Sequence, residues 1–282
     1  MSYKLTDTLL YLDKVSVGYP AKDKNGKDII NMILKDVTFT EKDIVREGIE
    51  STGQVIAFIG RSGRGKSTLF KALTGLIKPT SGQVLITDMG TDATDDAKVV
   101  EEGDVGFVDQ KYTLFRHKTM YEIFQYALNK SKLSKKDKDQ LIKKYLVEWG
   151  LEEHKDKYPC ELSGGQRQRT AIIEQMLTSK HFMVLDEPFS GLDVGNIEKV
   201  KLAFERISNS DELNTIIFST HDIRLAVEMA DSIYIIGHPE PDADYSTIVK
   251  HFDLKEMGLA WTEYGDGHRA LVDKIKKVVL NS

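Results

Sequence analysis

The chain of 282 residues, 40% of them hydrophobic, is long enough to bury the core of one large domain or of two smaller ones. Its net charge of −5 and pI near 5.9 give no general electrostatic attraction to nucleic acid, so no nucleic-acid partner is expected. A single cysteine, Cys160, excludes an intramolecular disulfide framework, fits a reducing cytosol, and is expected to be a small half-buried packing residue.

No apolar run approaches the roughly 18 to 20 residues that a membrane span requires, and the first ten residues lack the basic-then-apolar layout of a signal peptide. Any work at a membrane is therefore expected to depend on a separate membrane partner. The sequence also has no internal repeat or Gly/Ser linker, which favours one dominant compact unit.

The first third of the chain is predicted to form strands. Two such stretches are "LLYLDKVSV" (residues 9–17) and "MILKDVTF" (residues 32–39). Between them, "AKDKNGKD" (residues 21–28) has the polar composition of a hairpin tip.

A strand, a glycine-rich loop and a helix are predicted next. The apolar run "QVIAFIG" (residues 54–60) precedes the loop, and Leu69, Leu73 and Leu76 follow it at helical spacing. Pro79 is expected to stop this helix.

The second half of the chain alternates helical and strand patterns. Residues 111–180 are mostly helical in pattern, and the Lys-rich stretch 130–144 is expected to be a solvated helix face with its approach loop. The apolar runs 182–185, 215–220 and 232–236 are short and bounded by turn or polar residues. They are predicted to be buried parallel strands in an α/β arrangement.

The last forty residues give a weaker signal. Pro239 and Pro241 interrupt the preceding pattern. Leu271, Ile275 and Val278 then stand at i, i+4 and i+7, which predicts an amphipathic helix that packs back on its own domain.

The first glycine loop carries the strongest chemical signal. "GRSGRGKS" matches G-x-x-x-x-G-K-[ST] between a predicted strand and a predicted helix. Glycines let backbone N–H groups turn toward an anion, and the helix N-terminus adds its dipole. Lys66 would reach the β- and γ-phosphates of a triphosphate, and the Ser67 hydroxyl would ligate Mg²⁺. The predicted nucleotide-binding loop is Gly60, Arg61, Ser62, Gly63, Arg64, Gly65, Lys66, Ser67 and Thr68.

An acidic pair follows a later apolar strand. In "FMVLDE", Asp186 is placed to hold the Mg²⁺ shell and Glu187 to polarise a water molecule. An acidic strand end that caps the next turn is the alternative. A phosphate loop with such a pair is still compatible with kinases, GTPases and several kinds of ATPase.

A second glycine loop, "LSGGQRQR", favours one class of ATPase over kinases and GTPases. With this loop and the other motifs, the chain resembles the ATP-binding subunits of ABC transporters. The resemblance covers about residues 5–237. "GRSGRGKST" is similar to the Walker A loop, "LSGGQ" to the signature motif, and "FMVLDE" to Walker B. Further similar positions are Gln110 (the Q-loop glutamine), Asp193 (the D-loop), His221 (the switch histidine) and Tyr19 (the aromatic that stacks on adenine). Asp109 departs from the family, which often has a small or apolar residue before the glutamine.

The resemblance implies a fold and a division of the chain. It implies a P-loop NTPase with a RecA-like, mostly parallel sheet, an N-terminal antiparallel β subdomain and an inserted α-helical subdomain at about residues 111–180. The cassette would span residues 1–237. Residues 238–282 would be an extension packed on it.

The resemblance also implies roles in ATP hydrolysis. Glu187 would be the general base, and His221, Gln110 and Lys66 would complete the catalytic set. Ser67, Gln110 and Asp186 would hold Mg²⁺. In the family two cassettes pack head to tail, so the signature residues and the D-loop would contact ATP bound by the other copy. In this chain those residues are Ser163, Gly164, Gly165, Gln166 and Asp193.

The partners implied are a second cassette, identical or paired, and separate integral membrane subunits of an importer-like transporter, which would hold the chain on the inner face of the cell membrane. The aromatic-rich residues 112–126 would form either the groove for a membrane subunit or ordinary core. The alternative function is a soluble ABC ATPase that acts on nucleic acid, ribosomes or Fe-S assembly. A small-molecule P-loop kinase would have no use for the signature or the switch histidine.

Overall fold

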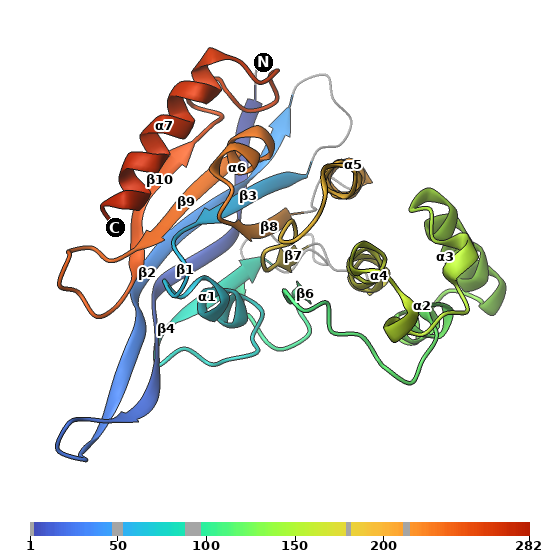
Figure 1. The fold of residues 1–282 in the computed structure, drawn as a ribbon, viewed down its shortest axis with the longest axis horizontal. Coiled ribbons are helices and arrows are strands. Elements are labelled where there is room, and N and C mark those ends of the chain that lie inside the picture. Colours follow the sequence, from blue (N-terminus) through green and yellow to red (C-terminus); the bar gives the residue numbers. More distant parts are fainter. Residues whose placement is uncertain (1–2, 47–52, 88–96, 179–181, 211–214) are drawn as a thin grey trace.

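Two β-sheets of different character form the centre of the fold (Figure 1). The computed structural model describes residues 3–46, 53–87, 97–178, 182–210 and 215–282. Its strands are β1 (Tyr3–Lys22), β2 (Asp28–Arg46), β3 (Gln54–Ile59), β4 (Ser81–Thr87), β5 (Ala97–Val99), β6 (Gly106–Val108), β7 (Phe182–Leu185), β8 (Thr215–Thr220), β9 (Ser232–Gly237) and β10 (Thr247–Asp253). Its α-helices are α1 (Lys66–Leu73), α2 (Met120–Ala127), α3 (Lys135–Glu148), α4 (Gly164–Leu177), α5 (Val194–Ser210), α6 (Ile223–Met229) and α7 (Asp266–Leu280).

The first sheet is antiparallel, with the strand order β2-β1-β4-β5. The second has the order β10-β9-β3-β8-β7-β6, in which all neighbours are parallel except β10 and β9. The predicted P-loop NTPase fold, with its antiparallel β part and its helical insertion, is therefore confirmed.

Alternate residues of the central strand β3 enter two different cores, because successive side chains of a strand point to opposite faces. Val55, Ala57 and Ile59 lie in a core shared with helices α2 to α7. Ile56 and Phe58 lie in a second core with α1 and the antiparallel sheet. Because both faces of the parallel strands are covered, these strands are continuous apolar runs in the sequence.

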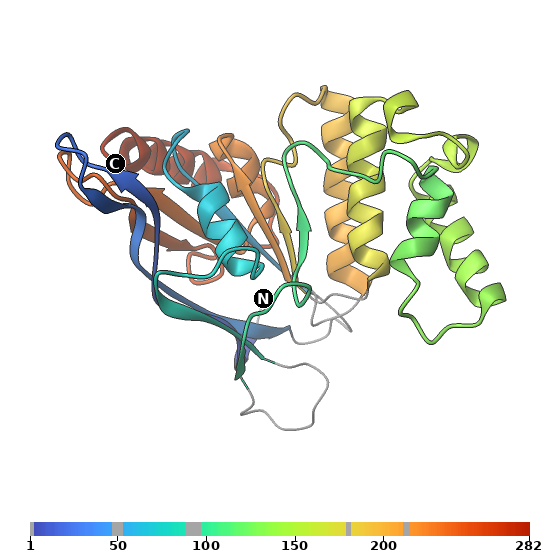
Figure 2. The ribbon, with the colours of Figure 1, turned by 90° about the horizontal axis from the view of Figure 1, so that it is seen from below.

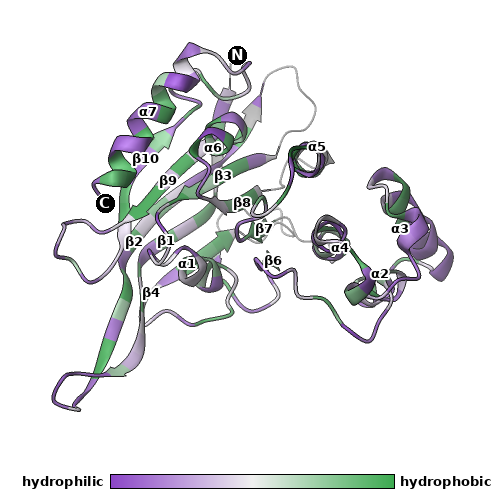
Figure 3. Cartoon of the chain, viewed as in Figure 1, coloured by the Kyte–Doolittle hydropathy of each residue, from purple (hydrophilic) through white to green (hydrophobic). Residues whose placement is uncertain are grey.

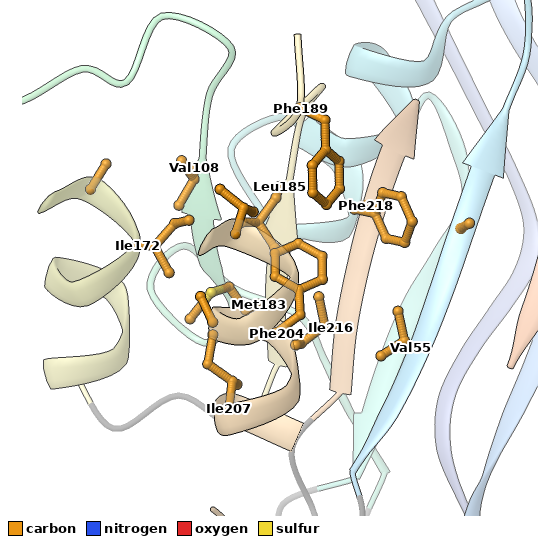
Figure 4. Close-up of a cluster of buried hydrophobic side chains, with 14 of the residues drawn as sticks. Val55, Val108, Ile172, Met183, Leu185, Phe189, Phe204, Ile207, Ile216 and Phe218 are labelled. Atoms are coloured by element: carbon orange, nitrogen blue, oxygen red, sulfur yellow. The ribbon is translucent and has the colours of Figure 1, made fainter. Parts of the chain in front are cut away.

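Three phenylalanines anchor the chain just after the acidic pair (Figure 4). Phe189 packs against Phe204 of α5 and Phe218 of β8, with ring centroids 5.5 and 5.7 Å away. The rings of Phe204 and Phe218 are 5.6 Å apart. Two of these pairs are edge-to-face and the Phe189–Phe204 pair is tilted, and such aromatic contacts contribute about 0.5–1.5 kcal/mol each beyond their buried area. They hold the turn after Glu187 against the sheet.

The helical part lies to one side of the parallel sheet, with α4 and α5 next to it and α2 and α3 beyond them (Figure 2). Much of the α3 ribbon has the colour of hydrophilic residues in Figure 3, and only Ile142 and Leu146 of this helix are buried. The lysine-rich stretch is therefore a solvated helix face, as predicted.

The tail after β9 adds one strand and one helix to the cassette. β10 pairs antiparallel with β9, and α7 packs against α6 and β9. Leu271 and Ile275 of α7 are buried and Val278 is half-buried, so the predicted amphipathic helix is confirmed. Within the described ranges, none of the helices combines the length and apolar character of a transmembrane segment.

Several local predictions differ from the structure. The helix after the phosphate loop ends at Leu73, well before Pro79, because Gly75 adopts a left-handed φ of 69° that ends the helical backbone. Leu76 therefore lies outside the helix and is 44% exposed. Cys160 is exposed in a short 3₁₀ turn, so the expected half-buried position is wrong. β1 and β2 are longer than predicted, and β10 was not predicted.

Candidate functional site

A cleft of about 580 Å³ opens at the carboxyl ends of the parallel strands. This edge of an open α/β sheet is where ligands bind in such folds. Its lining residues come from β1 and β2, the loop between β3 and α1 with the first turn of α1, the segments after β7 and β8, and the turn after β6. They are Tyr19, Ile33, Ser62, Gly63, Arg64, Gly65, Lys66, Ser67, Thr68, Gln110, Asp186, Glu187, Ser190 and His221.

The phosphate loop turns sharply at two glycines before α1 begins. Gly63 and Gly65 have φ angles of 81° and 85°, a region that costs other residues about 1–2 kcal/mol. Lys66 then starts the helix, and its Nζ donates to the carbonyl oxygens of Gly60 at 2.7 Å and Arg61 at 3.3 Å. Gly60 and Arg61 thus accept hydrogen bonds from Lys66 and are not among the residues that line the cleft. Glycine backbone, a buried ammonium and a helix N-terminus together suit a phosphate group.

The acidic pair at the end of β7 is held by one serine on the neighbouring strand. Ser219 Oγ donates to Asp186 Oδ1 at 2.6 Å and accepts the Glu187 N–H at 2.9 Å. Glu187 has a φ of 51°, which is unusual for a non-glycine residue. Backbone strain of this kind clusters at functional sites, where the surrounding structure maintains it.

The Glu187 carboxylate lies between two nitrogen groups. Its Oε1 is 3.8 Å from Lys66 Nζ and its Oε2 is 2.8 Å from His221 Nδ1. The three groups come from the phosphate loop, β7 and β8, whose carboxyl ends meet at this edge. A carboxylate in this position can accept a proton from a water molecule while the two nitrogen groups contact phosphate oxygens.

Asp109 organises the turn that presents Gln110. Its carboxylate accepts the Thr113 N–H at 3.0 Å and the Thr113 hydroxyl at 2.6 Å. Tyr112 in this turn has a φ of 50°, and its hydroxyl donates to the Pro188 carbonyl at 3.4 Å. Burial, with the nearby charges of Asp109 and Glu187, raises the pKa of Tyr112 to about 12. Asp109, which differs from the small or apolar residue frequent in the family at this position, thus caps the turn. Gln110 lies in the cleft and is exposed.

Tyr19 lines the mouth of the same cleft from β1, although it lies far before Gly60, the first residue of the phosphate loop, in the sequence. Its side chain is 42% exposed, and its neighbour across the ladder is Asn31 of β2. An exposed aromatic face at the mouth of a phosphate cleft can stack on a nucleobase.

The cleft also supplies the oxygen ligands that a magnesium ion prefers. The Ser67 hydroxyl, the Asp186 carboxylate and the Gln110 amide oxygen belong to residues that line it. Asp186 is only 6% exposed, and its hydrogen bond from Ser219 orients one carboxylate oxygen. Hydroxyl, carboxylate and carbonyl oxygens beside phosphate groups are suitable Mg²⁺ ligands.

The signature residues lie outside this cleft, at the start of α4. Ser163 caps the helix: its Oγ accepts the Gln166 N–H at 3.3 Å, while Gln166 Oε1 accepts the Ser163 N–H at 2.9 Å. Ser163 and Gly164 are exposed, and none of residues 163–166 lines the cleft. The structure therefore brings Lys66, Asp186, Glu187 and His221 together and leaves the second glycine loop facing outward.

The predicted D-loop residue lies beside the signature helix. A Cβ on Gly165 would be 3.2 Å from the Asn196 side chain, so the start of α4 approaches α5 closely. Asp193 accepts hydrogen bonds from the Asn196 N–H at 3.0 Å and from its side-chain amide at 2.7 Å. These hydrogen bonds lower the pKa of the Asp193 carboxyl, and the bond from the backbone N–H of Asn196 has the largest effect. Asp193 and the signature form one surface, separate from the cleft.

Sequence reasoning missed Ser219, which contacts both members of the acidic pair. Its position at the carboxyl end of a predicted parallel strand, two residues before His221, was the available signal. Ile33 and Ser190 also line the cleft without having been predicted.

The chain is similar to a known protein family and to individual known proteins. The family model described as ABC transporter matches residues 49–190. The chain is 36% identical over 187 residues to the sulfate/thiosulfate import ATP-binding protein CysA of Synechococcus elongatus, over 66% of this chain and 53% of that protein. It is 35% identical over 184 residues to the probable sulfate/thiosulfate import ATP-binding protein CysA of Chlorella vulgaris, over 65% of this chain and 76% of that protein.

A solved structure is similar over nearly the whole chain. It is cbiO1 from Clostridium perfringens, part of the ABC transporter complex cbiONQ, with a TM-score of 0.65 and 25% identity over 90% of this chain and 92% of that one. The chain spans little more than half the length of the first of the curated relatives. The motifs, the fold and these similarities agree, and the chain belongs to the ABC transporter family, among its ATP-binding subunits.

Proposed function

We propose that this chain hydrolyses ATP, with Mg²⁺, as the nucleotide-binding subunit of a transporter whose membrane subunits are separate polypeptides. The observation that carries this proposal is the placement of Glu187 between Lys66 and His221 in a glycine-lined cleft. The relatives named for sulfate and thiosulfate import support transport as the work that hydrolysis drives.

The residues of the cleft would divide the chemistry among them. The N–H groups of the phosphate loop and Lys66 would hold the β- and γ-phosphates, and Tyr19 would stack on the base. Ser67, Asp186 and Gln110 would hold Mg²⁺, which supplies positive charge against the phosphate oxygens. Glu187 would accept a proton from the attacking water, and His221 would hydrogen-bond the γ-phosphate. Ser219 would keep both carboxylates oriented.

A second cassette would complete the site. Ser163 presents its hydroxyl, Gly164 presents its N–H group, and together they expose the positive end of a 14-residue helix to solvent, on a surface that also holds Asp193. A helix terminus of this kind suits a phosphate, and the phosphate of its own chain lies in another place. We infer a head-to-tail pair, identical or mixed, in which ATP binds between the Lys66 cleft of one copy and the Ser163 loop of the other.

An aromatic patch on the helical part is a suitable contact for a membrane subunit. Phe124 is buried in the core, but Phe115 and Tyr126 are 38% and 52% exposed. Their rings are 5.0 Å apart, and Lys118 lies over Tyr126 at 5.5 Å. Exposed aromatic groups beside the turn that carries Gln110 could report the state of the cleft to a partner. Contact with such a partner would place the chain on the inner face of the cell membrane.

We also infer that residues 1–237 act as the cassette, with residues of about 111–180 as its helical part. Residues 238–282 would form an extension. The pairing of β10 with β9 and the packing of α7 on α6 support an extension that is fixed to the cassette.

Glu187→Gln is the test of the proposed chemistry. The amide cannot accept the proton, so phosphate release should fall by at least about a hundredfold, a loss typical of a missing general base. Dimers that form with ATP should persist in sedimentation experiments because hydrolysis no longer separates them. Glu153→Gln, at an exposed glutamate far from the cleft, should leave both unchanged. Retained hydrolysis in Glu187→Gln would reject the assigned base, and a protein that stays monomeric with ATP would reject the shared site.

A further inference from the structure

Three segments that are far apart in the sequence meet beside the phosphate loop. The Nη1 group of Arg64 lies 2.5 Å from His238 Nε2, and its Nη2 group donates to the main-chain carbonyl of Ser282 at 3.2 Å. A guanidinium has no acceptor atom, so Arg64 must be the donor and His238 Nε2 the acceptor. His238 therefore makes this contact in its neutral form.

The sheet topology explains this meeting. β9 lies next to β3 in parallel, so the residue after β9 reaches the loop after β3. The approach is close, because a Cβ on Gly60 would be 2.5 Å from the Ile236 carbonyl oxygen. α7 returns the chain to the same edge, where a Cβ on Gly237 would be 2.5 Å from the Ser282 side chain. His238 and Ser282 are thereby fixed to the cassette before they contact Arg64.

Arg64 is well placed to transmit this contact to the cleft. It lines the cleft and stands between Gly63 and Gly65, whose left-handed backbones carry no side chain that could fix the loop. Its Nε–H is buried and has no hydrogen-bond partner among the described residues. The Nη groups therefore supply the hydrogen bonds of this side chain, and both bonds go to the tail.

We propose that His238 is a positioning residue for nucleotide binding, which holds Arg64 and with it the phosphate loop in the shape that receives the phosphates. The proposal rests on the function proposed above. His238 acts through Arg64 and does not touch the nucleotide. Protonation of His238 removes the acceptor and places two cations in contact, so acid conditions release the loop.

The charges around His238 set the pH range of this effect. Burial and the positive charge of Arg64 lower the pKa of His238, while Asp244, in the loop after β9, opposes them. Release of Arg64 therefore occurs below the ordinary histidine value of about 6.5. At neutral pH the contact is intact.

The test is the Kd of ADP with Mg²⁺, measured by titration calorimetry at pH 7.5 and pH 5.5. His238→Gln retains an acceptor oxygen that does not titrate, and His238→Lys imitates the protonated state at every pH. Relative to His238→Gln, the wild-type protein should bind ADP more weakly at pH 5.5, by up to about tenfold, and equally at pH 7.5. A histidine pKa below the ordinary value of about 6.5 limits the effect of one protonation at pH 5.5 to about that factor. Because the terminal phosphate also titrates near pH 6, this comparison with the glutamine variant isolates the protein contribution.

His238→Lys should bind weakly at both pH values, and in an Arg64→Ala background it should have no further effect. His117→Gln, at an exposed histidine of another region, should follow the wild-type profile. Equal pH profiles in the wild type and His238→Gln would overturn the proposal, as would an effect of His238→Lys that persists without Arg64. A wild-type protein that binds no ADP at either pH would overturn the proposed function itself, and the positioning role with it.

Discussion

Glu174, in the last turn of α4, is a mostly buried carboxyl group, and the free-energy cost of burying its charge can be measured. Burial raises its pKa from the ordinary 4.5 to about 7, and no opposing interaction contributes to this change. A folded-state pKa above the unfolded value means that ionisation works against folding. The cost is absent below pH 4.5 and complete above pH 7, so stability falls as the pH rises through this range.

The expected size of the effect can be calculated from the same values. A pKa change from 4.5 to about 7 corresponds to about 3 kcal/mol in full, of which about 2.5 kcal/mol develops between pH 5 and pH 8. Glu174→Gln cannot ionise, so its free energy of unfolding relative to the wild type should rise by about 2.5 kcal/mol between these pH values. Guanidinium denaturation followed by circular dichroism measures this difference.

Glu205→Gln is the matched control, since it removes an exposed glutamate from the neighbouring helix α5. This variant should follow the wild-type pH dependence to within about 0.5 kcal/mol, as surface substitutions usually do. If Glu174→Gln and the wild type change in parallel between pH 5 and pH 8, the Glu174 carboxyl does not carry the cost of burial assigned to it.

Two further variants test the site and the fold. Ser219→Ala removes the group that orients Asp186 and Glu187, so ATP turnover should fall about 10- to 100-fold with a smaller change in nucleotide affinity. The control Ser208→Ala, which loses a hydrogen bond to Gly53, should keep its turnover. Equal losses of turnover in the two variants would argue against an orienting role of Ser219. Gly82→Ala places a Cβ 2.3 Å from the Asp13 carbonyl oxygen at a φ of 77°, so thermal denaturation should show a loss of more than about 2 kcal/mol. Gly26 has a similar φ but open space around it, so Gly26→Ala should lose only about 1 kcal/mol of stability. Similar losses of stability in Gly82→Ala and Gly26→Ala would mean that the close contact at Gly82 has no effect.

The elements that could be predicted from the sequence are those with local signals. The strands β3, β7, β8 and β9 are apolar because both faces of the sheet are covered, and the phosphate loop needs its glycines wherever it occurs. The tail strand β10 could not be predicted, because it has only one residue, Phe252, that is fully buried and therefore lacks a strong apolar pattern.

In the candidate site, too, only the residues with local sequence signals could be predicted. Motif spacing identified Lys66, Asp186, Glu187 and His221, which the fold brings together. Ser219 and the contact of Arg64 with His238 depend on which strands are neighbours in the sheet, and no local pattern encodes that order. The sequence predicted that Pro79 would end the helix after the phosphate loop, whereas the backbone of Gly75 ends it earlier, at Leu73.

The pairing of β10 with β9 also protects the cassette from self-association. All six residues of β9 are buried, and without β10 this apolar strand would be an edge strand with unpaired backbone N–H and C=O groups. Exposed edge strands of this kind pair with strands of other molecules, which leads to aggregation. Shortening the chain at the end of β9 would thus yield insoluble material for a reason unrelated to nucleotide chemistry, and single substitutions are the sounder way to study the residues after Gly237.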